Sequence, residues 1–230
     1  MRLVVISTSI GIMVCLACGG CATSVKEAEY KVVRKSGNFE VRDYAAHIVA
    51  ETVVDATLTD AGNVAFRPLF GYISGANKSR EKIAMTAPVS QRPVSEKIAM
   101  TAPVGQQRVQ GGWAISFMMP SSYTMESLPV PDDPAISLRQ IAARRMAAVK
   151  YSGGWSESRY RRYKNELEIW MGTNRYLALG EPVWARYDPP FMPWFLRRNE
   201  ILIPFQSDGL KGKQDQGAGS QLREQHSPTP

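Results

Sequence analysis

The chain reads Glu81-Lys-Ile-Ala-Met-Thr-Ala-Pro-Val89 and then, after a short linker, repeats the same nine residues as Glu96-Lys-Ile-Ala-Met-Thr-Ala-Pro-Val104. The spacing is too short for a solenoid repeat, so a local duplication explains it better. Alternation of side chains along each copy predicts an extended segment that the proline limits. We therefore expect a hairpin-like pair of edge segments, with Met85 and Met100 in the core. The phrase marks a fold and carries no chemistry that we can assign.

The residues before the duplication predict a strand followed by a helix. Residues 39–54 read as extended, and Phe66, Leu69, Phe70 and Ile73 recur at helical spacing. Thr59-Asp60 is suited to cap this helix, and Pro68 is expected to kink or shorten it. One of the duplicated segments and residues 113–119 then supply two strands.

The second half of the chain repeats this plan. Residues 136–151 read as extended, with a break near Ala142-Ala143, and Ser156 is placed to start a second helix. Strands over 183–187 and 200–205 complete the half. Two βαββ halves predict an α+β domain with a pseudo-twofold repeat. About eight mainly antiparallel strands would form a distorted barrel or a curved sheet with two flanking helices.

Several motifs resemble those of the SOUL/haem-binding protein family. They are Phe66-Arg-Pro-Leu-Phe-Gly-Tyr-Ile-Ser-Gly-Ala-Asn77 followed by Lys82-Ile-Ala-Met-Thr-Ala-Pro-Val89, with Phe39-Glu-Val-Arg-Asp-Tyr44, Trp113-Ala-Ile-Ser-Phe-Met-Met-Pro120, Tyr187-Asp-Pro-Pro190 and Arg197-Arg-Asn-Glu200. They occur in collinear order over residues 29–205. The resemblance implies the same fold and the binding of haem or another tetrapyrrole.

The resemblance also implies where the tetrapyrrole lies, namely between the first helix and the late loop over 187–195. A haem site needs an apolar slot and cationic groups for the propionates. The candidates are Phe66, Arg67, Phe70 and Ile73 on the helix, with Tyr187, Phe191 and Met192 on the loop. The alternative is that Phe66, Leu69 and Phe70 face the protein core.

The axial ligand differs from the family pattern. In the family member whose haem is held by histidine, that position corresponds here to Asp43. His47 lies four residues further along, on the same face as Asp43 if the strand is regular, and is the candidate iron ligand. The alternatives are a surface histidine with haem held by burial alone, or ligation by Tyr44, Met85 or Met192.

The N-terminal residues resemble a bacterial lipoprotein leader. An apolar run of signal-peptide length precedes Cys15-Leu-Ala-Cys-Gly-Gly-Cys21. Cys21 is our choice for lipidation, Cys18 is its rival, and an ordinary cleaved signal peptide is the alternative. We expect a leader over 1–20, a linker over 21–28, the binding domain over 29–206 and a disordered tail over 207–230. The sequence then predicts an envelope protein that faces the periplasm, with the outer membrane favoured.

The net charge of +7 favours an anionic ligand or surface. The chain has no nucleic-acid-binding motif and no hydrolase, metalloprotease or P-loop signature, so we expect neither nucleic-acid binding nor catalysis. The expected function is reversible haem binding by a membrane-anchored monomer that acts as carrier, buffer or sensor. The alternatives are a non-haem module for cationic or apolar molecules, as in effector-binding domains of bacterial regulators, and a structural envelope lipoprotein.

Overall fold

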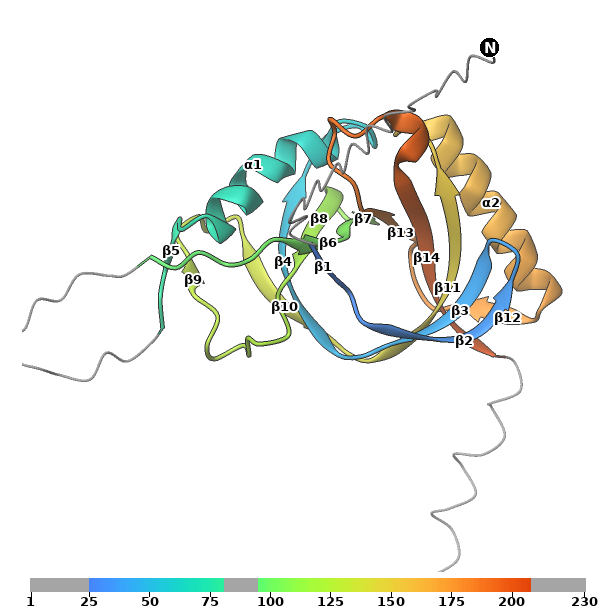
Figure 1. Cartoon of the computed structure of the whole chain (residues 1–230), viewed down its shortest axis with the longest axis horizontal. Coiled ribbons are helices and arrows are strands. Elements are labelled where there is room, and N and C mark those ends of the chain that lie inside the picture. The colour runs from blue at the N-terminus through green and yellow to red at the C-terminus, as the bar shows by residue number, and fades with distance from the viewer. Residues whose placement is uncertain (1–24, 81–94, 208–230) are drawn as a thin grey trace, which may run out of the picture.

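A computed structural model describes residues 25–80 and 95–207 (Figure 1). Its elements are β1 (Lys26–Glu27), β2 (Tyr30–Ser36), β3 (Phe39–Tyr44), β4 (His47–Val54), α1 (Ala61–Ile73), β5 (Asn77–Lys78), β6 (Thr101–Ala102), β7 (Val104–Val109), β8 (Gly112–Met118), β9 (Val130–Pro131), β10 (Ser137–Ile141), β11 (Arg144–Ser152), α2 (Glu157–Thr173), β12 (Tyr176–Ala178), β13 (Val183–Arg186), a 3-10 turn η1 (Trp194–Leu196) and β14 (Arg198–Ser207). The predicted leader, Cys18, Cys21, the first copy of the duplicated phrase with Met85, and residues 208–230 lie outside the described residues.

One large antiparallel sheet dominates the molecule. Its strand order is β10-β4-β8-β7-β13-β14-β11-β3-β2, and β12 joins β14. The order is mirrored about the β7–β13 pair. On one side follow β8, then β4, which leads into α1, then β10. On the other side follow β14, then β11, which leads into α2, then β3. The sheet has ten strands where about eight were expected. Because β10 and β2 are its two edges, the described residues form a curved sheet and not a closed barrel.

The two helices cover the outer, convex side of the sheet (Figure 1). Helix α1 packs on β4 and β8, whereas α2 packs on β11, β12 and β14. The α+β class with two helices and a large antiparallel sheet is thus confirmed. Each helix has a core of its own: Leu69 and Tyr72 are centred under α1, and Leu167 and Trp184 under α2. The concave side carries only a small apolar cluster, which leaves room there for polar side chains.

The helix boundaries follow local chemistry. Ser156 caps α2 as predicted, and its Oγ accepts a hydrogen bond from the Arg159 amide at 3.4 Å. Asp60 occupies the N-cap of α1 without a side-chain cap, and Thr57 Oγ1 instead accepts from the Asp60 amide. Helix α1 continues through Pro68 to Ile73, so the proline does not end it.

The second copy of the duplicated phrase does not form the predicted edge strand. Thr101–Ala102 forms a two-residue strand that pairs in parallel with β1, and Val104, the last residue of the copy, begins β7. The residues before Thr101 are hydrogen-bonded to the end of α1 and to the residues that follow it. The Ile98 amide donates to the Ile73 carbonyl at 2.8 Å, and the Asn77 side chain forms hydrogen bonds with the backbone of Glu96. Met100 is 37% exposed, so its predicted place in the core is wrong.

Candidate functional site

A cleft of about 450 Å³ lies on the concave side of the sheet, next to the start of β4. This volume lies within the range of about 300–1,000 Å³ that is typical of small-molecule sites. The walls are largely apolar and rich in methionine, a side chain that adapts its shape to a ligand. They include Tyr44, Ile48, Met118, Met119, Pro120, Tyr123 and Met125, with Lys26, Glu27, Glu29 and Glu126 among the charged residues.

A smaller hollow of about 90 Å³ extends the cleft along the floor of the sheet. Ala28, Tyr44, His47 and Met118 line both spaces, so the two adjoin each other. Strand alternation explains the lining of β4. Ala50 points to the α1 core, and Ile48 packs in that core while it also borders the cleft at the start of the strand, whereas His47, Val49 and Glu51 point to the concave face.

His47 is held with one ring nitrogen free. Its Nδ1 lies 3.0 Å from the Ala45 carbonyl oxygen, which only accepts hydrogen bonds, so Nδ1 carries the proton. The tautomer therefore leaves the Nε2 lone pair available, as in histidines that bind metals. Burial and the charge of Arg144 lower the pKa of His47 below its ordinary value, while the Ala45 bond partly opposes them. The ring is thus kept neutral.

Arg144 supplies a cation without an acidic partner. It is half-buried, and within residues 25–80 and 95–207 its side chain has no hydrogen bond or ion pair. Burial and the neighbouring Arg139 lower the pKa of Arg144. Arg139 itself is neutralised, since its Nη2 lies 2.7 Å from Glu51 Oε2. Arg144 is therefore the group of this hollow that is best prepared to receive an anion.

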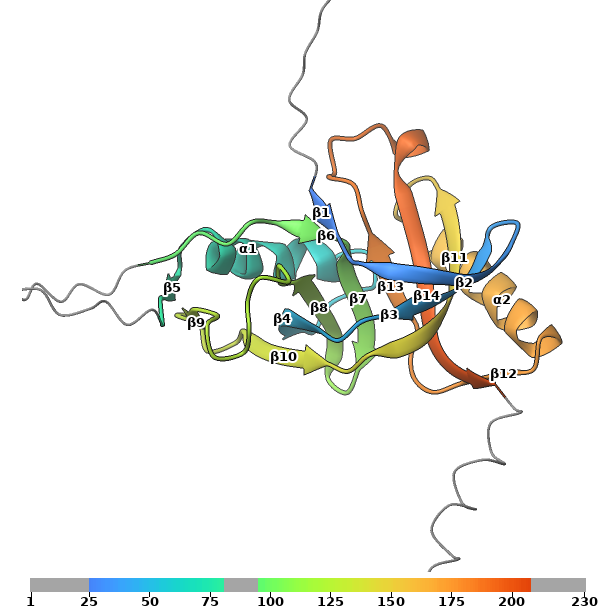
Figure 2. The same cartoon turned by 60° about the horizontal axis from the view of Figure 1, so that its bottom comes forward.

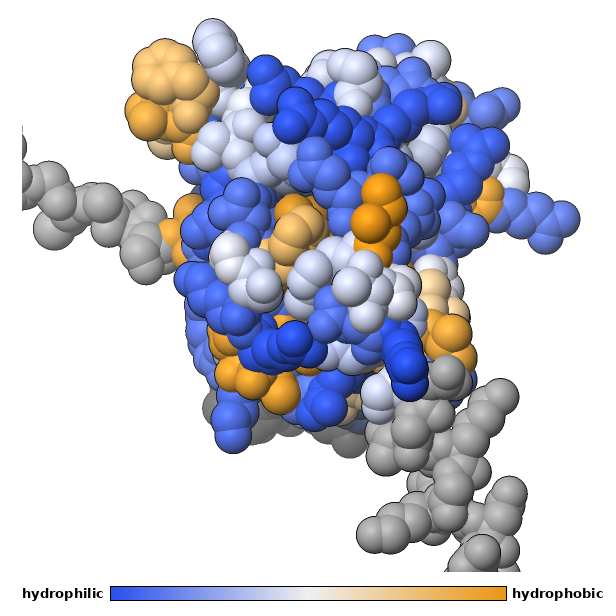
Figure 3. Space-filling view, turned by 90° about the vertical axis from the view of Figure 1, so that its right-hand side faces the viewer, coloured by the Kyte–Doolittle hydropathy of each residue, from blue (hydrophilic) through white to orange (hydrophobic). Residues whose placement is uncertain are grey.

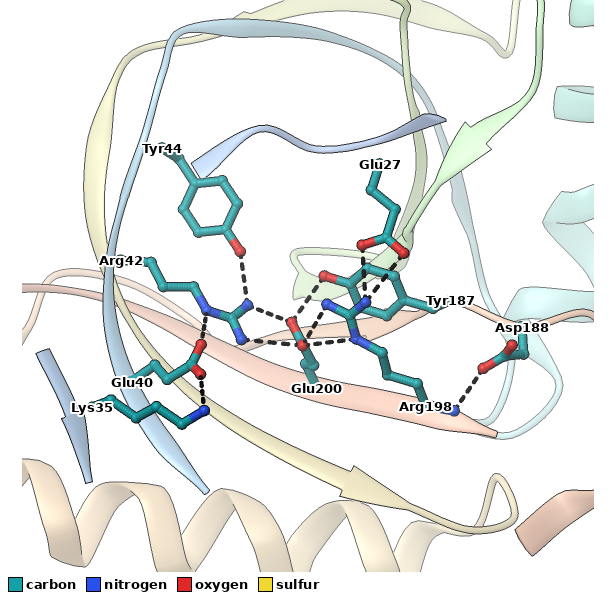
Figure 4. Close-up of polar contacts among 9 residues, drawn as sticks. All are labelled: Glu27, Lys35, Glu40, Arg42, Tyr44, Tyr187, Asp188, Arg198 and Glu200. Carbon is teal, nitrogen blue, oxygen red and sulfur yellow. Dashed lines mark hydrogen bonds and ion pairs between the residues drawn. The ribbon is translucent and has the colours of Figure 1, made fainter. Parts of the chain in front are cut away.

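A buried charge network adjoins the cleft on the concave face and shares Tyr44 and Glu27 with its wall (Figure 4). Glu200 is completely buried and accepts hydrogen bonds from Arg42 at 2.5 and 3.1 Å and from Tyr187 at 2.8 Å. Arg198 binds the same carboxylate at 2.9 Å and also pairs with Glu27. Burial raises the pKa of Glu200, but the two arginines outweigh it and hold the pKa below the ordinary value. The network is satisfied internally and is a structural element.

The predicted helix residues divide between two sides of α1. Ile73 is buried in the core under α1, so its side chain is not available to a ligand. Phe66 and Phe70 are 38% and 47% exposed, and their rings stack with centroids 5.6 Å apart. Arg67 is exposed beside them. The alternative that these residues face the core is thus confirmed for Leu69, whereas Phe66 and Phe70 stay partly exposed, although the Phe66 ring contacts buried Phe117 of β8 with centroids 5.5 Å apart.

The predicted loop residues do not line the cleft either. The Tyr187 hydroxyl donates a hydrogen bond to Glu200. Burial raises the pKa of Tyr187 most, and the Glu200 carboxylate raises it further. Phe191 is 85% exposed. Met192 is half-buried, and its carbonyl accepts a hydrogen bond from Arg197. Of the predicted site residues, His47 thus lines the cleft, whereas those on α1 and on the late loop do not.

Asp43 and His47 do not share a face of one strand. Residues 45 and 46 interrupt the extended run between β3 and β4, which makes the strand irregular. Asp43 points away from the cleft and forms a bidentate pair with Arg145 at 2.6 and 2.8 Å. The interruption turns His47 to the concave side, where Tyr44 also lies. The sequence pattern did not reveal this interruption.

The family of the chain is decided by a sequence match over residues 25–204 to the family described as "SOUL heme-binding protein". The chain belongs to this family. No curated protein matches it closely enough to add a relative. Within the described residues, no group of three or more His, Cys, Asp or Glu side chains could hold a bare metal ion.

Solved structures support the fold of this SOUL-family chain. The crystal structure of the EcmrR C-terminal domain superposes with a TM-score of 0.51 at 15% identity, covering 77% of this chain and 98% of that one. A hydrolase from Listeria innocua gives a TM-score of 0.52 at 11% identity, covering 76% and 94%. At such identities the likeness extends to the fold alone.

Proposed function

We propose that this protein reversibly binds haem or a related tetrapyrrole in the concave cleft, as a carrier, buffer or sensor and without catalysis. The observation that carries the proposal is the pairing of His47 and Arg144 in one apolar hollow of a chain from a haem-binding family. Bound haem would supply an iron centre with an open coordination position. His47 Nε2 is suited to hold that iron, and the Arg144 guanidinium to bind a propionate.

The charge of Arg144 favours haem, which carries carboxylates, over the alternative of a cationic ligand. A half-buried guanidinium without a carboxylate repels a cation and attracts a carboxylate. The acidic groups of the cleft are less decisive: Glu27 is paired with Arg198, and Glu29 and Glu126 are exposed. An anionic, largely apolar molecule therefore fits this chemistry better than a lipophilic cation.

Titration with haemin, followed by the Soret band, tests the proposal. Arg144→Ala should weaken binding by about 1.5–3 kcal/mol, the typical strength of a hydrogen bond to a charged group. His47→Ala should change the visible spectrum, because the ligand of the iron is lost. Arg67→Ala is the matched control on exposed α1 and should leave binding unchanged. A parent protein that gives no saturable Soret shift would refute haem binding.

The stacked pair Phe66–Phe70 favours a second candidate position on α1. An exposed aromatic pair next to Arg67 could cover one face of a macrocycle. Phe70→Asp would then abolish haemin binding, and Arg67→Ala would weaken it more than Arg144→Ala does. Because Phe70 is nearly half exposed, the substituted protein should still fold, which circular dichroism checks.

We further propose that the protein is a lipoprotein anchored through Cys21 in a bacterial envelope, facing the periplasm. The support is the run of small residues before Cys21 and the apolar stretch that precedes it. Cys21 lies outside the described residues, and no helix within them is long and apolar enough to cross a membrane. Mass spectrometry of the N-terminal peptide tests which cysteine carries the lipid.

A further inference from the structure

The loop between β13 and β14 exposes four large apolar side chains within six residues. Phe191, Trp194, Phe195 and Leu196 are 85%, 59%, 57% and 60% exposed, and we call these four the apolar tip. Figure 3 shows an apolar knob projecting at the upper left, at the end of the molecule where this loop lies. A cluster of this kind on an otherwise polar surface marks a binding surface.

The apolar tip is held outward by a rigid base. The Arg197 guanidinium donates to the carbonyl of Met192 at 2.7 Å and to that of Pro190, and it also stacks over Trp155 at 4.6 Å. At the other end of the loop, the Arg198 amide donates to Asp188 Oδ2 at 2.6 Å. These contacts fix the backbone, so the apolar side chains cannot fold back onto the protein without breaking them.

The charges at the base of the loop complement an anionic surface. No acidic residue occurs between Asp188 and Glu200. The guanidinium of Arg197 bonds only backbone carbonyls and lies over a tryptophan. Arg159 lies nearby, because its guanidinium approaches Gly153, whose amide donates to the Arg197 carbonyl at 3.3 Å. Among the described residues the Arg159 side chain has no acidic partner. Two cations therefore flank the tip without neutralisation.

The position of the tip relative to the chain's N-terminal side is also informative. Strand β1 is tied to the base of the loop by the Glu27–Arg198 ion pair at 2.9 Å. Figure 2 shows β1 and the loop at the same end of the molecule. The first strand of the described residues therefore lies beside the base of the tip.

We propose that the apolar tip inserts into the headgroup region of an anionic lipid bilayer. Tryptophan and phenylalanine with flanking cations suit this layer, where apolar and polar environments meet. Four side chains are too few for a stable protein interface, which takes about 800 Å² from each partner. They are sufficient for a shallow membrane wedge that fixes the orientation of the domain.

The test uses the full chain with vesicles of phosphatidylcholine containing phosphatidylglycerol and with vesicles of phosphatidylcholine alone. Trp194 is the exposed one of the five tryptophans, so brominated lipids should quench part of the fluorescence of the bound protein. In Trp194→Phe the quenched part should disappear while binding persists. The combined change Phe191→Ser and Leu196→Ser should weaken partition at least tenfold, since each removes a large apolar side chain from the interface.

Ile169→Ser is the matched control, because Ile169 is 62% exposed on α2, away from the tip, and its loss should change nothing. Arg159→Ala should reduce the preference for the anionic vesicles. Fluorescence from Trp194 that no brominated lipid quenches would overturn the proposal, even if other parts of the chain hold the protein on the vesicle. Self-association that Phe191→Ser abolishes, without such quenching, would overturn it in favour of contact between copies of the chain.

Discussion

Replacement of Glu200 by glutamine should destabilise the protein strongly. The amide keeps the shape of the side chain but removes the charge that neutralises Arg42, which is 1% exposed. Breaking a buried pair by removing one partner costs about 3–5 kcal/mol. Arg42 keeps Glu40 at 2.7 Å, and Arg198 keeps Glu27 at 2.9 Å. We therefore expect a loss near the lower limit, about 3 kcal/mol, which is a large fraction of the 5–15 kcal/mol that stabilises a typical domain.

Urea unfolding with unchanged m-values measures this loss. Asp43→Asn is the matched control, because the Asp43–Arg145 pair has similar geometry but is 43% and 46% exposed, and it should cost less than about 1 kcal/mol.

The pH dependence of stability gives a second criterion. The folded pKa of Glu200 lies below its ordinary value of 4.5. Its contribution is therefore present above that value and lost as the pH falls through the folded pKa, so parent and variant should converge in acid. Equal losses for Glu200→Gln and Asp43→Asn would refute the reasoning.

Three further predictions concern ligation, the second helix and export. Because the pKa of His47 is lowered, the histidine-type haemin spectrum should persist below pH 6.5, and the stability that the neutral ring contributes should be lost as the pH falls from 6.5 through the lower folded pKa; a spectral midpoint above 6.5 would contradict this. Ser156→Ala should cost about 1 kcal/mol in thermal or urea unfolding through loss of the α2 cap, and no measurable loss would show that the 3.4 Å bond contributes nothing. Cys21→Ser should release the protein from membranes in fractionation whereas Cys18→Ser should not, and a lipid found on Cys18 would reverse the assignment.

The parts of the fold with strong local signals were predictable from the sequence. Ser156 followed by apolar residues at helical spacing identified α2, and the small pair Ala142-Ala143 marked the break between β10 and β11. The place of Phe66 and Phe70 was not predictable. A helical repeat shows which residues share a stripe, but the width of the sheet beneath decides how much of that stripe is covered.

The candidate site depended on contacts that have no local signal. Arg42 and Glu200 are 158 residues apart in the sequence and meet only because β3 and β14 flank β11. Arg144 was visible as one of many basic residues, but its lack of an acidic partner was not, because it depends on Glu51, which lines the same hollow, pairing with Arg139 instead. The alternation of Glu40, Arg42 and Tyr44 on β3 was the one available hint that a polar set shares the concave face.

The mirrored strand order helps to explain why the two halves fill the concave face differently. In the second half, the concave face above β11 is filled by the long side chains of Arg42 and Glu200 from its two neighbours. In the first half, the strand that corresponds to β11 is β4. Its inner neighbour β8 contributes the short residue Ser116 and the next strand, β7, contributes Gly105, while the long paired side chains Glu51 and Arg139 lie towards the β10 edge. Because short side chains leave volume that long paired ones occupy, the hollow opens beside Ser116 and Gly105 and reaches across to Arg144 at the start of β11. Haemin should accordingly bind with a stoichiometry of one per chain.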